Sequence, residues 1–190
     1  LTAYMMVESK KGISANQIKR TLNVSYNTAW YLCHRIRAAM TETNPELLGG
    51  TVEADETYVG GKVRGKGRRY TGNKTMVICG VQRGGKARLT SGGKDEKDLY
   101  RALAHSFLRR HVRSDTKRLM TDEHPAYQKF AEENTSHETV KHSDYEWVNG
   151  DVHTNTVESV WSLLKRSIVG SYHKISTKHL DAYLDELEWR

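Results

Sequence analysis

The sequence predicts an α/β fold, in which a mixed five-stranded sheet is flanked by helices and preceded by a small helix-turn-helix unit. The first 45 or so residues have helical patterns, and the chain then changes to runs rich in β-forming residues. Later segments alternate between helical and strand patterns. The breakers Asn44-Pro45 and Gly49-Gly50 separate the two blocks. We therefore divide the chain into a helical region, 1–47, and a sheet-containing domain, 48–190.

The helical region contains two helices joined by a short turn. Ser14 and Ser25 are suited to cap helices at residues 15–22 and 26–40. The apolar stripe of the second helix consists of Ala29, Cys33, Ile36 and Met40, and the residues largely off this stripe are Asn27, Thr28, Tyr31, Arg35 and Arg37. In a helix-turn-helix module the start of the second helix faces the DNA major groove. This predicts DNA contacts by Tyr26, Asn27, Thr28 and Arg35, although a helical hairpin that only packs on the main domain fits the same pattern.

The second block has a regular order of elements. The predicted strands are 51–59, 75–82, 86–90, 117–121 and 138–141, and the predicted helices are 95–112, 124–132, 156–169 and 177–187. Gly84-Gly85 is a two-residue link of the kind that closes a hairpin. The elements thus follow the ribonuclease-H-like order: three strands, a helix, a strand, a helix, a strand and a helix. In that fold, carboxylates from the first strand, the fourth strand and a late helix converge on one side of the sheet.

The composition limits the classes of partner. A formal net charge of +7 and a pI near 9.4 favour a polyanion, but do not separate DNA from RNA or an anionic membrane surface. No apolar run approaches the roughly 20 residues that span a bilayer, and no signal peptide opens the chain. We therefore expect an intracellular protein that does not enter membranes. Because Cys33 and Cys79 are the only cysteines, a disulfide framework and a four-cysteine zinc site are excluded.

Three acids occupy positions that are unusual for a charged side chain. Asp55 lies inside a strand pattern, Asp122 ends another, and Glu158 lies one turn into a helix. A carboxylate in a core strand costs desolvation free energy unless a positive group compensates it, and hard divalent cations take oxygen ligands. Two such ions about 3.5 to 4 Å apart stabilise the attacking and leaving oxygens of a phosphoryl transfer. We predict that Asp55, Asp122 and Glu158 are catalytic ligands of two Mg²⁺ or Mn²⁺ ions.

Neighbouring residues leave alternatives open. Strand alternation places Glu53 on the face of Asp55, where it is a possible auxiliary acid, and places Glu56 on the other face, where we expect it to be solvated. Asp151 is a weaker rival of Glu158, which itself fits an ordinary exposed helical face. The histidines near these acids have phosphate contact, orientation of a nucleophile or helix capping as alternative roles; they are His124, His153 and His173.

Two basic segments lie close to the predicted site. A glycine-rich loop between the first two strands contains no acid, and its basic residues include Lys62, Arg64, Lys66, Arg68 and Arg69. Beside a metal site, such a loop would neutralise DNA phosphates, although a solvated hairpin has the same composition. On the late helix, Lys165 shares a face with Glu158 and Ser162, and Arg166 follows it. We predict phosphate contacts for Lys165 and Arg166.

These motifs together resemble one family. Residues 52–62 (VEADETYVGGK), 120–123 (MTDE) and 153–166 (HTNTVESVWSLLKR) are similar to ISXO-like bacterial insertion-sequence transposases, relatives of the eukaryotic Merlin elements. Residues 10–40 are similar to the helix-turn-helix region of that family. The resemblance implies an Asp-Asp-Glu core made of Asp55, Asp122 and Glu158. Because some members have Asn in the third place, Asn155 is a lesser candidate.

The resemblance also implies a reaction and its partners. We expect metal-dependent cleavage at the 3′ end of an insertion sequence and transfer of that strand, with transposon ends and target DNA as substrates. A homo-oligomer on DNA and a cytoplasmic, nucleoid-associated location in bacteria are further expectations. The alternatives are a ribonuclease-H-like nuclease and a domesticated DNA-binding protein with an inactive core. Since the family's amino-terminal zinc ribbon is missing, we expect this sequence to be a fragment whose helix-turn-helix region is truncated at its start.

Overall fold

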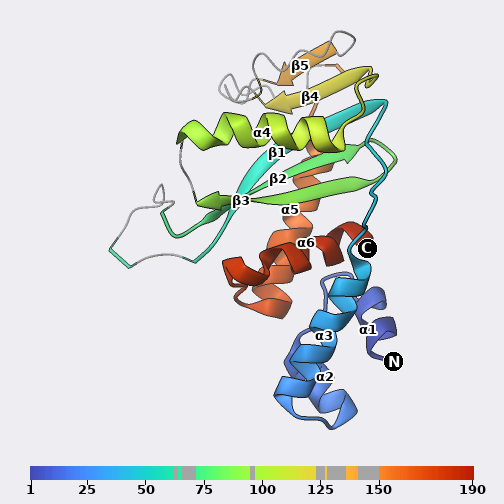
Figure 1. Cartoon of the computed structure of the whole chain (residues 1–190), viewed down its shortest axis with the longest axis vertical. Coiled ribbons are helices and arrows are strands. Elements are labelled where there is room, and N and C mark those ends of the chain that lie inside the picture. Colours follow the sequence, from blue (N-terminus) through green and yellow to red (C-terminus); the bar gives the residue numbers. More distant parts are fainter. Residues whose placement is uncertain (62–63, 66–71, 95–96, 123–126, 128–135, 141–149) are drawn as a thin grey trace. The chain divides into compact units, whose positions relative to one another are not determined.

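The chain forms two compact units in the computed structural model (Figure 1). One unit comprises Leu1–Thr43 together with Trp161–Arg190, and the other comprises Asn44–Val160. The residues that the structure describes are 1–61, 64–65, 72–94, 97–122, 127, 136–140 and 150–190. Whereas the sequence-based division keeps all residues from 48 onward in one domain, in the structure the last segment packs with the first helices.

The unit Asn44–Val160 contains a mixed five-stranded sheet of order β3-β2-β1-β4-β5. Its strands are β1 (Thr51–Val59), β2 (Thr75–Gln82), β3 (Ala87–Lys94), β4 (Arg118–Asp122) and β5 (Ser136–Val140). β1, β2 and β3 are antiparallel neighbours, whereas β4 pairs parallel with β1 and β5 pairs parallel with β4. This is the ribonuclease-H-like order, so the predicted fold class is confirmed.

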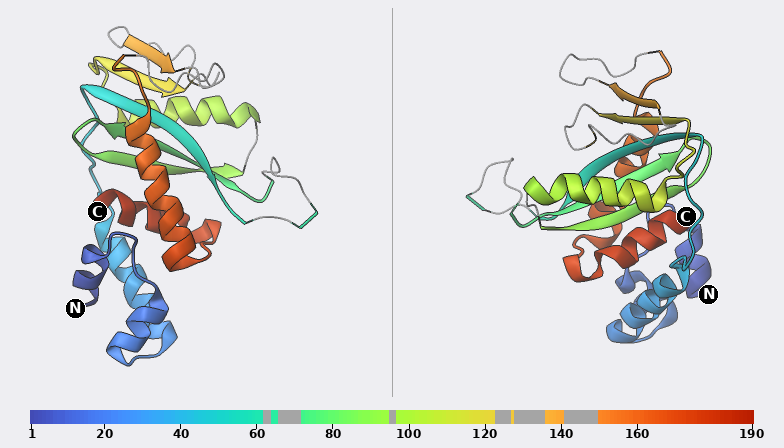
Figure 2. Two further views of the ribbon diagram at one scale, coloured as in Figure 1. Left: turned by 180° about the vertical axis from the view of Figure 1, so that it is seen from behind. Right: turned by 45° about the horizontal axis from the view of Figure 1, so that its top comes forward.

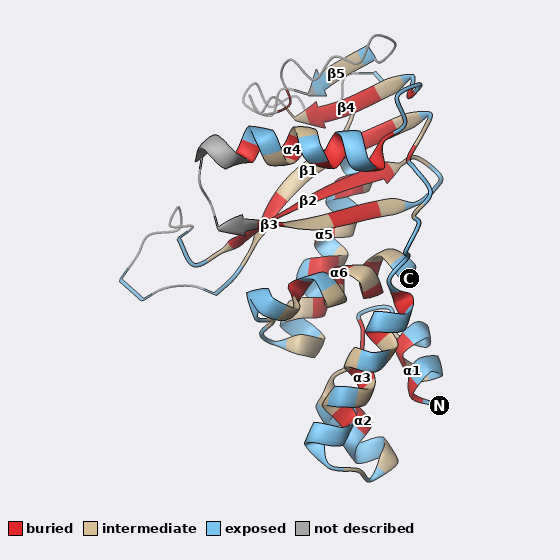
Figure 3. Cartoon of the chain, viewed as in Figure 1, coloured by how far each residue is buried: buried red, intermediate tan, exposed pale blue. Residues whose placement is uncertain are grey.

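The alternation of side chains along β1 explains how the sheet is covered. Val52 and Ala54 belong to the main hydrophobic core, which includes Ala104, Phe107 and Leu108 of α4 (Lys97–His111). Figure 3 shows the buried residues concentrated in the central strands. Residues one position away point to the opposite face of the sheet. On that face lies the beginning of α5 (Asn155–Ser167), which is behind the sheet in Figure 1 and in front of it in the left view of Figure 2.

The predicted hairpin between β2 and β3 is present. The Gln82 amide donates to the Lys86 carbonyl at 2.9 Å, and Gly84 has a positive φ of 70°, which glycine adopts at little cost. The third strand extends four residues beyond the predicted end at Thr90, to Lys94. The helix predicted at 124–132 lies outside the described residues, apart from position 127.

The other unit begins with three helices, α1 (Thr2–Glu8), α2 (Ala15–Leu22) and α3 (Tyr26–Met40). The predicted caps are confirmed: the Ser14 hydroxyl accepts a hydrogen bond from the Gln17 amide, and the Ser25 hydroxyl accepts one from the Thr28 amide. A small core of apolar side chains holds the three helices together; it consists of Met6, Ile13, Ile18, Ala29, Cys33 and Met40.

One prediction about α3 was wrong. Arg37 is not on the exposed side, because its position four residues after Cys33 brings it into line with the apolar stripe. Its guanidinium Nε lies 2.7 Å from Glu186 Oε2 of α6 (Leu180–Trp189), and the two side chains are 2% and 0% exposed. The guanidinium also stacks 4.0 Å from the ring centre of Tyr183. This buried ion pair ties the last helix to the third.

The final segment differs in detail from the sequence-based prediction. After α5 the chain forms a π-helical turn at Ile168–Tyr172, and a 3₁₀ turn at Thr177–His179 precedes α6. None of the helices among the described residues has both the length and the apolar composition required to cross a bilayer.

Candidate active site

The parallel pairing of β1 and β4 places two of the predicted metal ligands at the same level of the sheet. The register pairs Ala54 with Thr121, so that Asp55 and Asp122 follow one residue later on adjacent strands. Both side chains are partly buried. The sequence alone did not establish this pairing, because neighbouring strands can slide by whole residues until their register is fixed by packing.

A third acid completes the group. Asp55, Glu56 and Asp122 each offer a carboxylate oxygen, and these three oxygens lie within 4.8 Å of one another. Within the part of the chain that the structure describes, this is the group of acids and histidines close enough to hold a metal ion. Three like charges at this separation repel one another unless protons or a cation intervene.

The position of Glu56 corrects the expectation that it is solvated. Glu56 is in phase with Val52 and Ala54 on β1, so it points to the side of the sheet that α4 covers. The Tyr127 hydroxyl donates to Glu56 Oε2 at 3.0 Å. Burial raises the pKa of Glu56, hydrogen bonds from Tyr100 and Tyr127 oppose this, and the charge of Asp122 adds to it.

The chemistry of the group fits a divalent cation. Carboxylate oxygens are the ligands that Mg²⁺ and Mn²⁺ prefer, and a bound cation would relieve the charge repulsion that contributes to the raised pKa of Glu56. Asp55 and Asp122, from adjacent strands, are suited to hold the ion directly. Glu56 is a residue of the site that sequence reasoning missed, although its period-two phase with the core residues of β1 was visible.

Glu53 has a different role from the other acids of β1. It is fully buried, and Arg83 Nε lies 2.6 Å from its Oε1. Its Oε2 accepts hydrogen bonds from the backbone amides of Thr156 (2.8 Å) and Val157 (3.1 Å), and the Thr156 hydroxyl donates to Oε1 at 2.8 Å. Helix starts leave such amides without partners inside the helix. Glu53 therefore caps α5 from a distant strand, and also places a negative charge at the positive end of that helix.

The chain is similar in sequence to known proteins. The family model described as ISXO2-like transposase domain matches residues 47–190. The chain belongs to this transposase family. A protein of Halobacterium salinarum, "Uncharacterized protein in transposable element ISH50", is 30% identical in an alignment of 190 positions that covers 93% of this chain and 64% of the relative. The chain thus spans a little less than two thirds of that relative's length.

Solved structures that resemble the transposase chain include two from retroviruses. The HTLV-2 integrase catalytic core domain in complex with magnesium matches with a TM-score of 0.42 and 16% identity, over 77% of this chain and 86% of that chain. The simian T-cell lymphotropic virus intasome matches with a TM-score of 0.43 and 13% identity, over 90% and 67% of the two chains.

The third predicted ligand of the transposase core lies at the start of α5. Glu158 is exposed, and its amide donates to the Thr154 carbonyl at 3.0 Å, within the first helical turn. Among the described acids it lies outside the group of Asp55, Glu56 and Asp122. It follows directly after Thr156 and Val157, the residues that Glu53 binds. Asn155, the lesser candidate, is the exposed first residue of α5.

The segment before α5 is held by arginines. Arg83 donates to the carbonyl oxygens of Asp151 (2.9 Å) and His153 (3.1 Å), and the Asp151 carboxylate is paired with Arg118. His153 Nδ1 lies 3.4 Å from Glu53 Oε1. These contacts give Asp151 and His153 a structural role at the entry of the helix. The sequence did not indicate the role of Arg83, because all of the residues that it contacts here are far from it along the chain.

The residues predicted to bind DNA are in part outside the described residues. Lys62, Lys66, Arg68 and Arg69 fall there, as do Glu123 and His124, whereas Arg64 is exposed. The described candidates with exposed side chains in the other unit are Tyr26, Asn27, Thr28, Arg35, Lys165 and Arg166. His173 has a positive φ of 58°, and its Nδ1 lies 3.1 Å from the Val169 carbonyl.

Proposed function

We propose that this chain is the catalytic part of a DNA transposase that cleaves the 3′ end of an insertion sequence and joins that end to target DNA. The observation that carries the proposal is the group of three carboxylates, Asp55, Glu56 and Asp122, which lies where β4 ends and its parallel pairing with β1 stops. Two divalent ions bound there, Mg²⁺ or Mn²⁺, would activate the attacking oxygen and stabilise the leaving oxygen of an in-line displacement.

The protein residues divide the remaining work. Asp55 and Asp122 would bind the ions from adjacent strands, and Glu158 would supply a further ligand from the first turn of α5. Glu53 fixes this turn through the amides of Thr156 and Val157, which limits the freedom of Glu158. Transition-state stabilisation depends on ligands that are positioned before the reaction.

DNA binding in this proposal uses the exposed residues of the helices. Tyr26, Asn27 and Thr28 would enter the major groove, since their exposed side chains stand at the start of α3, a helix that Ser25 caps after a short turn. Arg35, Lys165, Arg166 and the basic loop contact phosphates, which gives salt-sensitive affinity. Two DNA ends must be held together for joining, so we propose a homo-oligomer on DNA.

The test is a strand-transfer assay with DNA that carries the ends of the element, in the presence of Mg²⁺ or Mn²⁺. We expect Asp55→Asn, Asp122→Asn and Glu158→Gln each to reduce joining by a factor on the order of 10³ or more, as for single members of a catalytic group. Asp115→Asn, an exposed acid paired with Arg113, is the matched control and should leave joining unchanged. Full activity of Asp122→Asn would contradict the assignment.

The same experiment separates the alternatives. Cleavage of end DNA without any joined product would indicate a nuclease instead of a transposase. Calorimetric titration of the full chain with Mn²⁺ tests the metal independently of the reaction, because a metal site should lose its heat of binding in Asp55→Ala. DNA binding with neither joining nor heat of metal binding would indicate a DNA-binding protein with an inactive core.

A further inference from the structure

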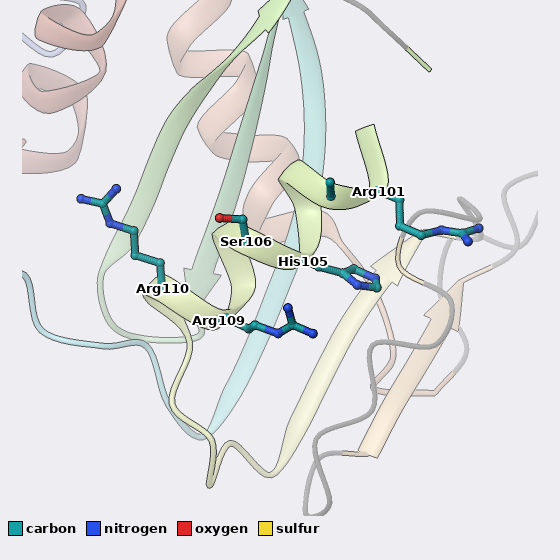
Figure 4. A pocket seen from close by; sticks show the side chains of 6 residues that line it. Arg101, His105, Ser106, Arg109 and Arg110 are labelled. Atoms are coloured by element: carbon teal, nitrogen blue, oxygen red, sulfur yellow. The ribbon is translucent and has the colours of Figure 1, made fainter. Parts of the chain in front are cut away.

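The exposed side of α4 carries a row of basic residues that the proposed site does not use. Arg101, Arg109 and Arg110 are exposed, and with Ala102, His105 and Ser106 they line an open hollow of about 640 Å³ (Figure 4). The other side of α4 is occupied, because Ala104, Phe107 and Leu108 pack in the core of the sheet. The basic side is therefore the one available for a partner.

Arg109 and Arg110 have no acidic residue within four positions of them on either side. Residues 100–114 contain no Asp or Glu. Other basic side chains of the unit are paired with acids: Arg113 with Asp115, and Lys86 with Glu46. Arg109 and Arg110, by contrast, form no ion pair within the described residues. Arginines without acidic partners on an exposed helix attract an anionic partner.

The spacing of the row suits a repeating anion. Positions 101, 105 and 109 are four residues apart, so they share one face of the helix and are separated by about 6 Å per step along its axis. Figure 4 shows the side chains of Arg101, His105 and Arg109 extending on the side of β4, whereas Arg110 extends toward the other side of the helix. Guanidinium groups bind phosphates with two parallel hydrogen bonds, which distinguishes them from simple point charges.

The row begins beside the carboxylate group. Tyr100 precedes Arg101, and its hydroxyl interacts with Glu56. A nucleic acid strand that lies along Arg109, His105 and Arg101 would therefore lead to the acids Glu56, Asp55 and Asp122. If the carboxylate site acts on DNA, the phosphates of that DNA lie close to this row. This favours DNA over an acidic protein as the partner that binds here.

We propose that the outer face of α4 is a DNA-docking surface, on which Arg101, Arg109 and Arg110 bind backbone phosphates of the DNA that enters the carboxylate site. This inference rests on the proposed function, which identifies the DNA as the substrate of the carboxylate site. The binding of DNA phosphates to α4 is tested separately from that function. Because the contacts are to phosphates, the surface contributes affinity and register and reads no base sequence.

The experiment measures DNA binding by the full chain without divalent metal, so that catalysis plays no part. Fluorescence anisotropy of labelled duplex is recorded over a range of salt concentrations for the unchanged protein and for the double variant Arg101→Gln with Arg109→Gln. Each lost phosphate contact should reduce the slope of log affinity against log salt by about 0.9, so the double variant should lose about 2 and bind several-fold more weakly at low salt.

The controls use the chain's own residues. Arg113→Gln, just beyond α4, removes an exposed arginine that Asp115 already neutralises, and it should change neither affinity nor slope. Arg101→Lys with Arg109→Lys keeps the charge and should restore most of the slope. Glutamine is almost as good a helix former as arginine, and circular dichroism confirms that the helix is retained.

Two results would overturn the inference. One is an unchanged salt slope in the folded double variant. The other is a change in the oligomeric state of the DNA-free double variant, measured by sedimentation, while its DNA binding stays the same. That result would indicate that this face of α4 contacts protein instead of DNA. A failure of the proposed function would give a different result. Asp122→Asn would then retain strand transfer, whereas the α4 variants would still change the salt dependence of DNA binding.

Discussion

Both compact units contain acids that are buried or partly buried, but the surroundings of these acids differ. In the unit of Leu1–Thr43 and Trp161–Arg190, Glu186 meets Arg37 at 2.7 Å and accepts a hydrogen bond from the Tyr172 hydroxyl at 2.8 Å. In the unit of Asn44–Val160, Asp55, Glu56 and Asp122 bring three like charges within 4.8 Å. The charge of a structural acid such as Glu186 is thus neutralised by a basic side chain of the protein. The charges of the acid cluster need a cation from solution to neutralise them. Acid-to-amide substitutions should therefore act in opposite directions at an acid that the chain neutralises and at a member of this cluster.

The largest expected effect on stability is that of Glu186→Gln. The substitution leaves the guanidinium of Arg37 buried without its counter-charge, and breaking such a pair costs about 3–5 kcal/mol of unfolding free energy. Urea unfolding followed by tryptophan fluorescence measures it, because Trp30, Trp161 and Trp189 lie in this unit.

The matched control for Glu186→Gln is its neighbour Asp185→Asn, which alters an exposed hydrogen bond from the Thr41 hydroxyl. The change in unfolding free energy should be much smaller for this control. Equal effects of the two substitutions would show that the ion pair with Arg37 has no special role.

Glu53→Gln tests whether a matched acid in the other unit behaves like Glu186. An amide has one acceptor oxygen, so either Arg83 or the start of α5 loses its partner, at a cost of about 1–3 kcal/mol. The cost is smaller than for Glu186 because Arg83 is 24% exposed and can be partly solvated. Faster hydrogen exchange at the amides of Thr156 and Val157 would be the local signature.

Glu53→Gln should also reduce strand transfer by roughly 10- to 100-fold, as for residues that orient metal ligands. Glu46→Gln removes an exposed acid paired with Lys86 and serves as the control for both measurements. Unchanged exchange in the first turn of α5 would show that Glu53 does not hold this helix.

Glu56→Gln should raise the unfolding free energy, whereas Glu186→Gln and Glu53→Gln lower it. In the metal-free protein the substitution removes one of three like charges while the amide oxygen still accepts from Tyr127, so we expect a gain of about 0.5–1 kcal/mol. In the presence of Mn²⁺ the gain should disappear, because the unchanged protein is then stabilised by the ion. Thermal unfolding with and without Mn²⁺ measures both quantities; a less stable metal-free variant would refute the contrast.

The smallest effect concerns pH and one histidine in each unit. Burial, with the nearby charge of Arg37, lowers the pKa of His34 to about 4, and burial beside Arg110 and Arg88 lowers that of His111 to about 4. Both are neutral when folded, whereas the unfolded chain takes up protons near pH 6.5. Their contribution to stability is therefore present above pH 6.5 and is lost as the pH falls toward 4.

His34→Gln and His111→Gln should each weaken this dependence by up to about one proton. Urea unfolding at a series of pH values between 4 and 7 measures it. A slope that neither substitution changes would place the acid sensitivity in other groups.

Local features of this protein were predictable from its sequence. Helical patterns predicted α2 and α3, and runs of β-forming residues predicted β1 and β2, all with the bounds that the structure has; the caps Ser14 and Ser25 followed from residue type. The order of elements predicted the fold class, and strand context singled out Asp55 and Asp122. These features depend on neighbours within a few residues, where the chain geometry fixes which side chains can meet.

The tertiary structure decided which charges meet. Arg37 and Glu186 are 149 residues apart in the chain, and Glu53 and Thr156 are 103 apart, so no local pattern indicated either contact. Glu56 joined the acids because the core beneath α4 fixed its face of β1 and the parallel register brought Asp122 beside it. Sequence determined where acids stand on strands and helices. Only long-range packing, which selects one register and one set of partners, decided which acids the chain neutralises and which remain together as a group.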